Sequence, residues 1–204
     1  MDERLASLID ALGERAGRHD AEEPDRLRRW RVLEPSAGRF VWFLVQALGA
    51  RTVVEIGTSR GVSTLWLADA LRATGGQLLS VDLDEAAQRQ AAAHLAEAGA
   101  ELRDRVSFRI ADGGAVLAEL ADQSVDLLFL DAERVEYPGW WPHPRRVLRP
   151  GGVLVADNAT SHPAEIAPLR ELIERDPELV TTTLEIGKGE LVALRRPTPT
   201  PTPS

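Results

Sequence analysis

Short apolar runs alternate with longer amphipathic segments from residue 51 onward, and this alternation limits the fold more than any other feature of the chain. Five of the short runs are predicted strands, at 52–56, 77–81, 106–110, 125–130 and 152–156. The amphipathic segments are predicted helices, at 62–73, 85–98, 114–121, 140–147 and 163–175. Strands and helices that alternate in this way build a doubly wound, mostly parallel α/β sheet with helices on both faces.

The end of the sequence predicts a change of strand direction. Two further apolar runs, 179–186 and 190–194, are separated only by Gly187, Lys188 and Gly189. Three residues suffice for a hairpin but not for a parallel crossover. We therefore expect a seven-stranded sheet that finishes with an antiparallel hairpin strand, followed by a disordered Thr-Pro tail over 197–204.

The first 50 residues predict a helical cap in front of the sheet domain, which would span 51–196. Apolar residues at three-to-four spacing predict helices over 2–17, 25–32 and 36–48. The N-terminus has no continuous apolar stretch of the kind found in signal peptides and membrane spans, which favours a cytoplasmic protein without membrane contact. The amphipathic pattern fits a homodimer interface and also fits helices packed on their own domain.

Composition narrows the classes of ligand. The chain has 24 lysine and arginine residues against 32 aspartate and glutamate residues, a formal net charge of −8, so nucleic acid is not expected as a partner. It contains no cysteine, which excludes disulfides and thiolate metal sites. Lys188 is its only lysine.

A glycine-containing turn follows the first predicted strand, at the edge where such sheets bind ligands. Gly57 and Gly61 let a ligand approach the backbone, and Ser63 at the helix start can donate to a carboxylate. A dinucleotide fingerprint needs glycine where Ser59 stands, and a P-loop needs Gly-Lys-Ser/Thr, so neither pattern is met. A tight turn without a ligand is the alternative interpretation.

Acidic side chains follow the other predicted strands. Asp82 can accept hydrogen bonds from ribose hydroxyls, and Asp112 can accept one from an adenine amino group; both also fit turn or capping positions. Asp131, Asp157 and Asn158 offer two carboxylates and an amide oxygen, a hard ligand set that suits Mg²⁺. Alternatively, Asp131 contacts only the cofactor or caps a turn, and 157–158 is an ordinary loop.

Taken together, Glu55-x-Gly57-x-x-x-Gly61, the acidic strand end and Ala111-Asp112-Gly113 resemble the class I S-adenosylmethionine-dependent methyltransferases. The resemblance covers about residues 36–194 and implies a Rossmann-like fold. It also implies that the ribose of the cofactor contacts Asp82, that the adenine contacts Asp112 and Gly113, and that Asp131 lies close to the cofactor. The methionine part of the cofactor would contact the turn after the first strand, at Glu55, Gly57, Thr58, Gly61 and Ser63.

A narrower resemblance is to the catechol O-methyltransferase-like family, which includes bacterial predicted O-methyltransferases. It is carried by Asp131-Ala132-Glu133-Arg134, Tyr137, the segment Leu-Arg-Pro-Gly-Gly at 148–152 and Asp157-Asn158. It implies methyl transfer to an oxygen of a small molecule, such as a vicinal phenol. It further implies Mg²⁺ or another divalent cation bound by Asp131, Asp157 and Asn158.

One position departs from that family. In that family the general base is commonly a lysine three residues after the first aspartate that binds the metal, which corresponds to Asp131 here. This chain has Arg134 at the lysine position, and an arginine stays protonated. Arg134 is therefore expected to stabilise a phenolate or a substrate carboxylate. His162 and His143 are candidate bases, although each taken alone fits a surface or structural histidine better. The lost lysine also favours a metal-independent methyltransferase acting on a sugar, amine or carboxylate. A nicotinamide-dependent oxidoreductase and a non-catalytic binding module are more distant alternatives.

A second departure concerns the pocket wall. The segment between Asn158 and Pro163 is shorter than in many relatives, so the pocket is either more open or closed by the N-terminal helices and by Trp140 and Trp141. Aromatic residues at a helix start pack in the core more often than they line a site. We therefore expect both tryptophans in the core.

Overall fold

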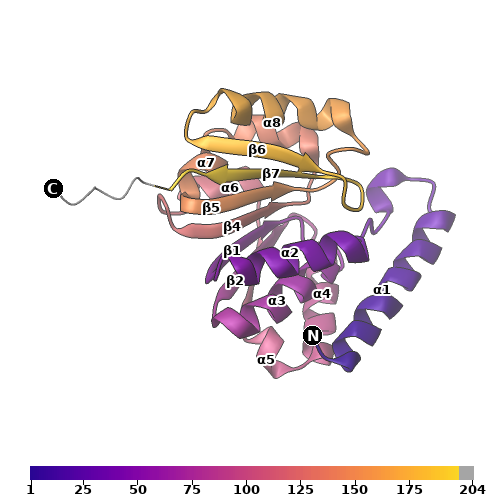
Figure 1. Ribbon diagram of the computed structural model, residues 1–204. Helices are drawn as coiled ribbons and strands as arrows, with labels where there is room; N and C mark the ends of the chain where they lie inside the picture. Colours follow the sequence, from indigo (N-terminus) through magenta and orange to yellow (C-terminus); the bar gives the residue numbers. More distant parts are fainter. Residues whose placement is uncertain (198–204) are drawn as a thin grey trace.

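The computed structural model describes residues 1–197, which contain a seven-stranded sheet. The sheet crosses the centre of the molecule with helices on both faces (Figure 1). The strand order is β3-β2-β1-β4-β5-β7-β6. In chain order the strands are β1 Thr52–Ile56, β2 Gln77–Asp82, β3 Val106–Ile110, β4 Val125–Leu130, β5 Leu148–Ala156, β6 Leu179–Leu184 and β7 Glu190–Arg195.

The pairing confirms the predicted sheet. Neighbouring strands from β3 to β5 pair in parallel, whereas β7 is antiparallel to both β5 and β6. The hairpin therefore closes the sheet as the three-residue link indicates. The predicted tail begins at Pro197, and its residues 198–204 lie outside the described part of the chain.

Most helices lie where the periodicity predicts them. The α-helices are α1 Glu3–Glu22, α2 Pro35–Ala47, α3 Val62–Thr74, α4 Glu85–Ala98, α5 Ala100–Arg103, α6 Gly113–Glu119, α7 His143–Val147 and α8 Pro163–Arg175. Two 3₁₀ helices are η1 Arg26–Arg28 and η2 Arg134–Trp140. The bounds of α4 and α8 match the prediction, and α4 begins there because the Asp84 carboxylate caps the amides of Ala86 and Ala87.

The helix predicted over 25–32 is wrong, because only η1 forms there. The Asp20 carboxylate accepts hydrogen bonds from the amides of Trp30 (2.7 Å) and Arg31 (2.9 Å), and these bonds hold the segment against α1. Arg31 has a φ of 45°, which no right-handed helix accommodates. The chain therefore crosses from η1 to α2 as an irregular segment.

The helix predicted over 140–147 is also wrong in its first half. η2 ends at Trp140, Trp141 is extended, and α7 begins only at His143. Pro142 has no amide hydrogen to donate and disfavours a helical conformation in the residue before it. The break separates the two short helices.

The core lies on both faces of the sheet. Val53, Leu127 and Phe129 belong to a cluster on one face, and Val54 and Leu128 belong to a cluster on the other. This alternation is the period of two expected for strands. The first cluster also contains Leu5 and Ile9 of α1 and Val41 of α2, so the N-terminal helices share the core of the sheet.

The N-terminal helices cover α3, whose residues 62–71 are all buried. A helix that is apolar all round needs partners on every side. The sheet covers one side of α3, and α2 lies across another (Figure 1). Gly38 of α2 permits this contact, because a Cβ there would overlap the Trp66 ring of α3. No helix within residues 1–197 has the length and apolar character needed to cross a membrane.

Candidate active site

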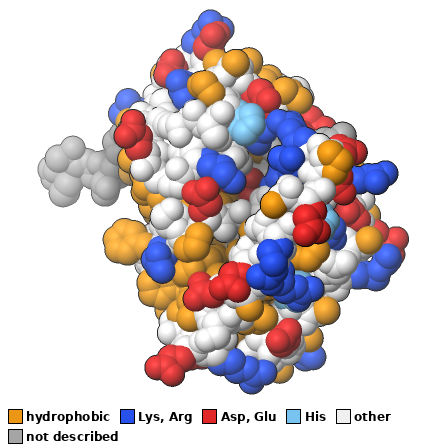
Figure 2. All heavy atoms as spheres, turned by 90° about the vertical axis from the view of Figure 1, so that its right-hand side faces the viewer, with side chains coloured by type: hydrophobic (Ala, Val, Ile, Leu, Met, Phe, Trp, Pro, Cys, Tyr) orange, Lys and Arg blue, Asp and Glu red, His pale blue; other side chains and the backbone are white. Residues whose placement is uncertain are grey.

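A cavity of about 510 Å³ lies at the carboxyl ends of the parallel strands. Its wall includes residues at or just after the end of each of β1 to β5, among them Gly57, Asp82, Asp112, Asp131 and Asn158. The structure thus brings together the strand-end residues that the sequence singled out, because parallel strands end at one edge of the sheet. Figure 2 shows this side of the molecule, where acidic and basic side chains lie interspersed.

The turn after β1 touches the turn after β4. Gly57 has a φ of 105°, and a Cβ at this position would overlap the carbonyl oxygen of Asp131. Backbone hydrogen bonds fix the contact: Gly57 N donates to Val81 O and Asp131 N donates to Ile56 O, both at 2.8 Å. The glycine is therefore required for this close approach as well as for the turn.

Glu55, Thr58, Gly61 and Ser63 lie behind the turn and are absent from the described lining of the cavity. Glu55 is fully buried and accepts hydrogen bonds from the Thr64 and Ser80 hydroxyls at 2.6 and 2.5 Å. Thr58 and Ser63 are also buried, and Gly61 packs against α4. In this structure these residues hold the shape of the turn.

Glu55 makes stability depend on pH. Burial raises its pKa to about 7, against hydrogen bonds from the Ser63, Ser80 and Thr64 hydroxyls that lower it. Between the unfolded pKa of 4.5 and about 7, the folded state binds more protons, so stability falls as pH rises through this window. In Glu55→Gln, the free energy of unfolding is expected to fall by up to about 3 kcal/mol less over this pH range than in the wild type. A plot of Tm against pH should therefore be flatter for the variant. Equal slopes for both proteins would contradict this assignment.

Asp82 and Asp112 line the cavity and also bond to the backbone. The Asp82 carboxylate accepts from the amides of Ser59 (2.8 Å) and Asp84 (2.9 Å). Asp112 caps α6 by accepting from the amide of Ala115 at 2.8 Å. Because each carboxylate oxygen can accept a further hydrogen bond, the capping and ligand-binding interpretations are compatible at both positions.

Asp131, Asp157 and Asn158 form a cluster in which Asp131 and Asn158 line the cavity and Asp157 contacts Asn158. The Asn158 amide nitrogen donates to Asp157 Oδ2 at 2.8 Å and lies 3.4 Å from Asp131 Oδ1. Burial raises the pKa of Asp131 well above its usual range, and the Asp157 charge adds to this; burial also raises the pKa of Asp157. Within residues 1–197 neither aspartate forms an ion pair.

Glu190 at the start of β7 adds a third buried acid. Burial raises its pKa to about 10, and the charges of Asp157 and Asp131 act in the same direction. Buried like charges without a cation are unfavourable, and either bound protons or a cation relieves them. A divalent cation bound here would therefore favour the ionised forms of these acids over the protonated ones.

The ligand set is small. Among the described residues, acidic, histidine and cysteine side chains nowhere gather in threes in a metal-binding arrangement. Asp131, Asp157 and Asn158 instead offer two carboxylates and one amide, a donor set that Mg²⁺ accepts when water or substrate completes the shell. The amide nitrogen of Asn158 points at the carboxylates here, so cation binding requires the amide to turn its oxygen toward them.

Arg134 lies in the cavity wall but is already paired. Its side chain is only 4 % exposed, and Nε and Nη2 both lie within 2.9 Å of Glu165 Oε2. Arg26 and Arg31 bond to Glu133 at 2.9 and 2.8 Å, and Arg26 also reaches Glu165. These ion pairs connect the segment around η1 to η2 and α8, and they neutralise much of the Arg134 charge.

His162 reaches the cavity, whereas His143 does not belong to its described lining. The Nδ1 atom of His162 lies 2.9 Å from the Ser161 hydroxyl. Burial and the Arg134 charge lower the pKa of His162, which favours the neutral ring. Of the two candidate bases, only His162 thus lies where it can contact a methyl acceptor bound in the cavity.

Comparison with known proteins decides the family. A family model described as a methyltransferase domain matches residues 54–159. A candidate O-methyltransferase of Mycolicibacterium vanbaalenii is 37% identical over 178 residues, which cover 80% of this chain and 77% of that protein. The O-methyltransferase of Bacillus cereus in complex with SAH, the demethylated cofactor, is 26% identical with a TM-score of 0.77, over 93% of this chain and 91% of that one.

This chain belongs to the class I S-adenosylmethionine-dependent O-methyltransferases. The O-methyltransferase TomG of Streptomyces achromogenes, in complex with SAM, is similar at 25% identity and a TM-score of 0.74, covering 96% of this chain and 91% of TomG. The methyltransferase therefore uses S-adenosylmethionine. The family excludes the two distant alternatives, a nicotinamide-dependent oxidoreductase and a non-catalytic binding module.

The methyltransferase's cavity also includes residues that the sequence did not single out as site residues, among them Trp30, Arg31 and Lys188. Trp30 stacks on His19 with ring centroids 4.8 Å apart, and its carbonyl accepts from the Ser59 hydroxyl at 2.6 Å. The helix predicted over 25–32 gave no reason to place Trp30 and Arg31 at the cavity. Trp140 is buried as expected but lines the cavity as well, so the core and the pocket wall are not exclusive here.

Tyr137 anchors the loop that carries Asp131. Its hydroxyl accepts from Ala132 N at 2.8 Å and donates to Ala132 O at 3.0 Å, and its side chain is fully buried. Tyr137→Phe leaves both backbone groups unpaired, so we expect the unfolding free energy to fall by about 1–3 kcal/mol. We also expect kcat to fall as Asp131 loses its position. Urea unfolding and steady-state kinetics test this, and wild-type values in both would refute it.

Proposed function

We propose that this methyltransferase moves the methyl group of S-adenosylmethionine to a hydroxyl oxygen of a small, catechol-like acceptor, with a divalent cation bound by Asp131, Asp157 and Asn158. The observation that carries the proposal is that Asp131 and Asn158 line the same cavity as Gly57 and Asp82, with Asp157 in contact with Asn158. The proposed cofactor contacts are the β1 turn around Gly57, Asp82 at the ribose, and Asp112 with Gly113 at the adenine. The acceptor then lies between the cofactor and the acidic cluster.

The cavity residues have separate roles in the proposed reaction. Asp131 and Asp157 supply the negative charge and Asn158 the neutral oxygen that hold the cation, which would polarise the acceptor oxygen when bound. His162 takes the hydroxyl proton. Because the sulfonium is a good leaving group, the enzyme gains most from orienting the acceptor oxygen toward the methyl carbon and stabilising its charge.

The test is methyl transfer to 3,4-dihydroxybenzoate, measured with Mg²⁺ and with EDTA, beside 3-hydroxybenzoate as the matched acceptor with one hydroxyl. We expect transfer to the vicinal diol only, loss of the activity with EDTA, and its return with excess Mg²⁺. Equal activity with EDTA would instead favour the metal-independent alternative, which the orientation of the Asn158 amide nitrogen supports. Transfer to neither compound would exclude the catechol-like acceptor.

A further inference from the structure

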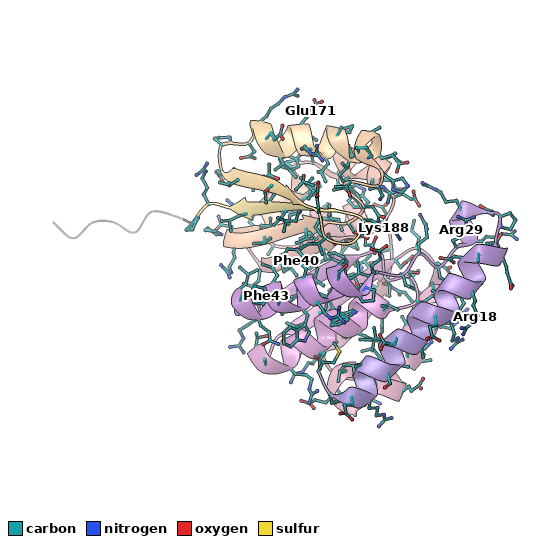
Figure 3. The ribbon with its side chains drawn as sticks, turned by 45° about the vertical axis from the view of Figure 1, so that its right-hand side comes forward. Arg18, Arg29, Phe40, Phe43, Glu171 and Lys188 are labelled. Carbon is teal, nitrogen blue, oxygen red and sulfur yellow. The ribbon has the colours of Figure 1, made fainter. Side chains whose placement is uncertain are left out.

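The only lysine of the chain is fixed beside the acidic cluster by its backbone. Lys188 lies in the β6–β7 turn, on the side of the molecule that carries α1 and Arg29 (Figure 3). Its carbonyl oxygen accepts from Thr160 N (3.0 Å), Thr160 Oγ1 (2.7 Å) and Ser161 N (3.0 Å). A Cβ on Gly189, whose φ is 92°, would overlap Thr160. The turn is thereby packed against the loop that follows Asn158.

Lys188 belongs to the wall of the cavity in which we propose that the reaction takes place. It lines the same cavity as Asp131, Asn158 and His162. Burial raises the pKa of Asp131 and of Asp157, and the Lys188 charge opposes this effect at both residues. The shared cavity lining and the hydrogen bonds of the Lys188 carbonyl to Thr160 and Ser161 place Lys188 next to the loop that follows Asn158.

Lys188 is available for a ligand, and Arg134 is not. The ion-pair partner of Lys188 among residues 1–197 is Glu34, with Nζ 3.7 Å from Oε1 and both side chains about two-fifths exposed. A pair of this kind contributes little to stability, so a ligand can displace it at small cost. Arg134, by contrast, is buried against Glu165 through two nitrogens.

We infer that the Lys188 ammonium group contacts the reacting oxygen of the acceptor and stabilises its negative charge. This rests on the proposed function and adds a catalytic residue to it. The hydroxyl proton passes to His162, the oxygen forms a bond to the methyl carbon, and the C–S bond breaks with its electron pair left on sulfur. The positive charge of the sulfonium is thus balanced by the proton that His162 gains, and Lys188 keeps its charge throughout.

The kinetic test compares Lys188→Met, which removes the charge, with Lys188→Arg, which keeps it. With 3,4-dihydroxybenzoate and saturating S-adenosylmethionine, we expect Lys188→Met to lower kcat/KM at least about 100-fold, as for the loss of an oxyanion donor. Lys188→Arg should retain most of the activity. Glu34→Gln is the control, because it removes only the surface partner and should stay near the wild-type rate. Calorimetry should give all variants wild-type affinity for S-adenosylhomocysteine.

A second test needs no turnover. Acetylation by N-acetoxysuccinimide has only two amines to modify, Lys188 Nζ and the N-terminus, and mass spectrometry separates them. With S-adenosylhomocysteine present, 3,4-dihydroxybenzoate at ten times its Kd should slow acetylation of Lys188 about tenfold and leave the N-terminus unchanged.

The outcomes separate the two proposals. If calorimetry shows no binding of 3,4-dihydroxybenzoate to the wild type, the acceptor proposal is refuted, and the inference on Lys188 with it. If the wild type binds and methylates the compound, but Lys188→Met does so at a similar rate or Lys188 is not protected, only the inference on Lys188 is overturned.

Discussion

Asp131→Asn is expected to lower kcat/KM for methyl transfer about 1,000-fold while the protein becomes more stable. The substitution keeps the shape of the side chain but removes one charge from the cluster that we propose binds the cation and the acceptor oxygen, and a loss of this kind reduces transition-state stabilisation strongly. Stability should rise because burial and the Asp157 charge oppose ionisation of Asp131 in the folded state. Steady-state rates and urea unfolding measure the two effects.

The opposite signs of the two effects distinguish a functional residue from a structural one. Asp122→Asn is the matched control, since Asp122 is exposed, pairs with Arg146 and does not belong to the described lining of the cavity. It should leave the rate unchanged. A variant Asp131→Asn that keeps a tenth or more of the wild-type rate would show that the cluster is not the reacting site.

Gly57→Ala is expected to destabilise the fold by about 3 kcal/mol or more and to abolish binding of S-adenosylhomocysteine. The φ of 105° is unfavourable for alanine, and the new Cβ would overlap the carbonyl of Asp131 and lie 3.0 Å from Ala132 N. The turns after β1 and β4 must then separate. Since both turns line the cavity, cofactor affinity and stability fall together, as calorimetry and urea unfolding would show.

Gly13→Ala is the control for this substitution. Gly13 lies within α1, and a Cβ there would meet nothing within 4 Å. Alanine at a helical position without steric conflict should stabilise the protein by about 0.5–1 kcal/mol and leave cofactor binding intact. A Gly57→Ala protein that binds S-adenosylhomocysteine as tightly as the control would refute the contact between the two turns.

The elements best predicted from the sequence were those whose signals are local. The limits of α4 follow from the Asp84 cap, and the hairpin follows from the three residues between its strands. The helix over 25–32 could not be excluded, because the bonds that prevent it come from Asp20 on another helix. The break at Trp141, in contrast, had a local signal in Pro142, which the apolar periodicity around Trp140 outweighed in the prediction.

The candidate site was predictable to the extent that it lies at strand ends. Gly57, Asp82, Asp112, Asp131 and Asn158 reach one cavity because the sheet topology requires it. The sequence could not separate Gly57 from Glu55, which lies two residues earlier and behind the turn. Lys188 depends on how the hairpin folds over the loop after β5, which is tertiary information, although its isolation between two glycines was a visible signal.

The most direct test of the central claim is cation binding itself. Mn²⁺ is a spectroscopic substitute for Mg²⁺, and electron paramagnetic resonance counts free and bound ions without any acceptor. With S-adenosylhomocysteine present, the account predicts one bound Mn²⁺ per wild-type chain, and loss of this binding in Asp131→Asn and in Asp157→Asn but not in Asp122→Asn. Wild-type protein that binds no Mn²⁺, or an Asp157→Asn variant that binds it as tightly as wild type, would contradict the metal site.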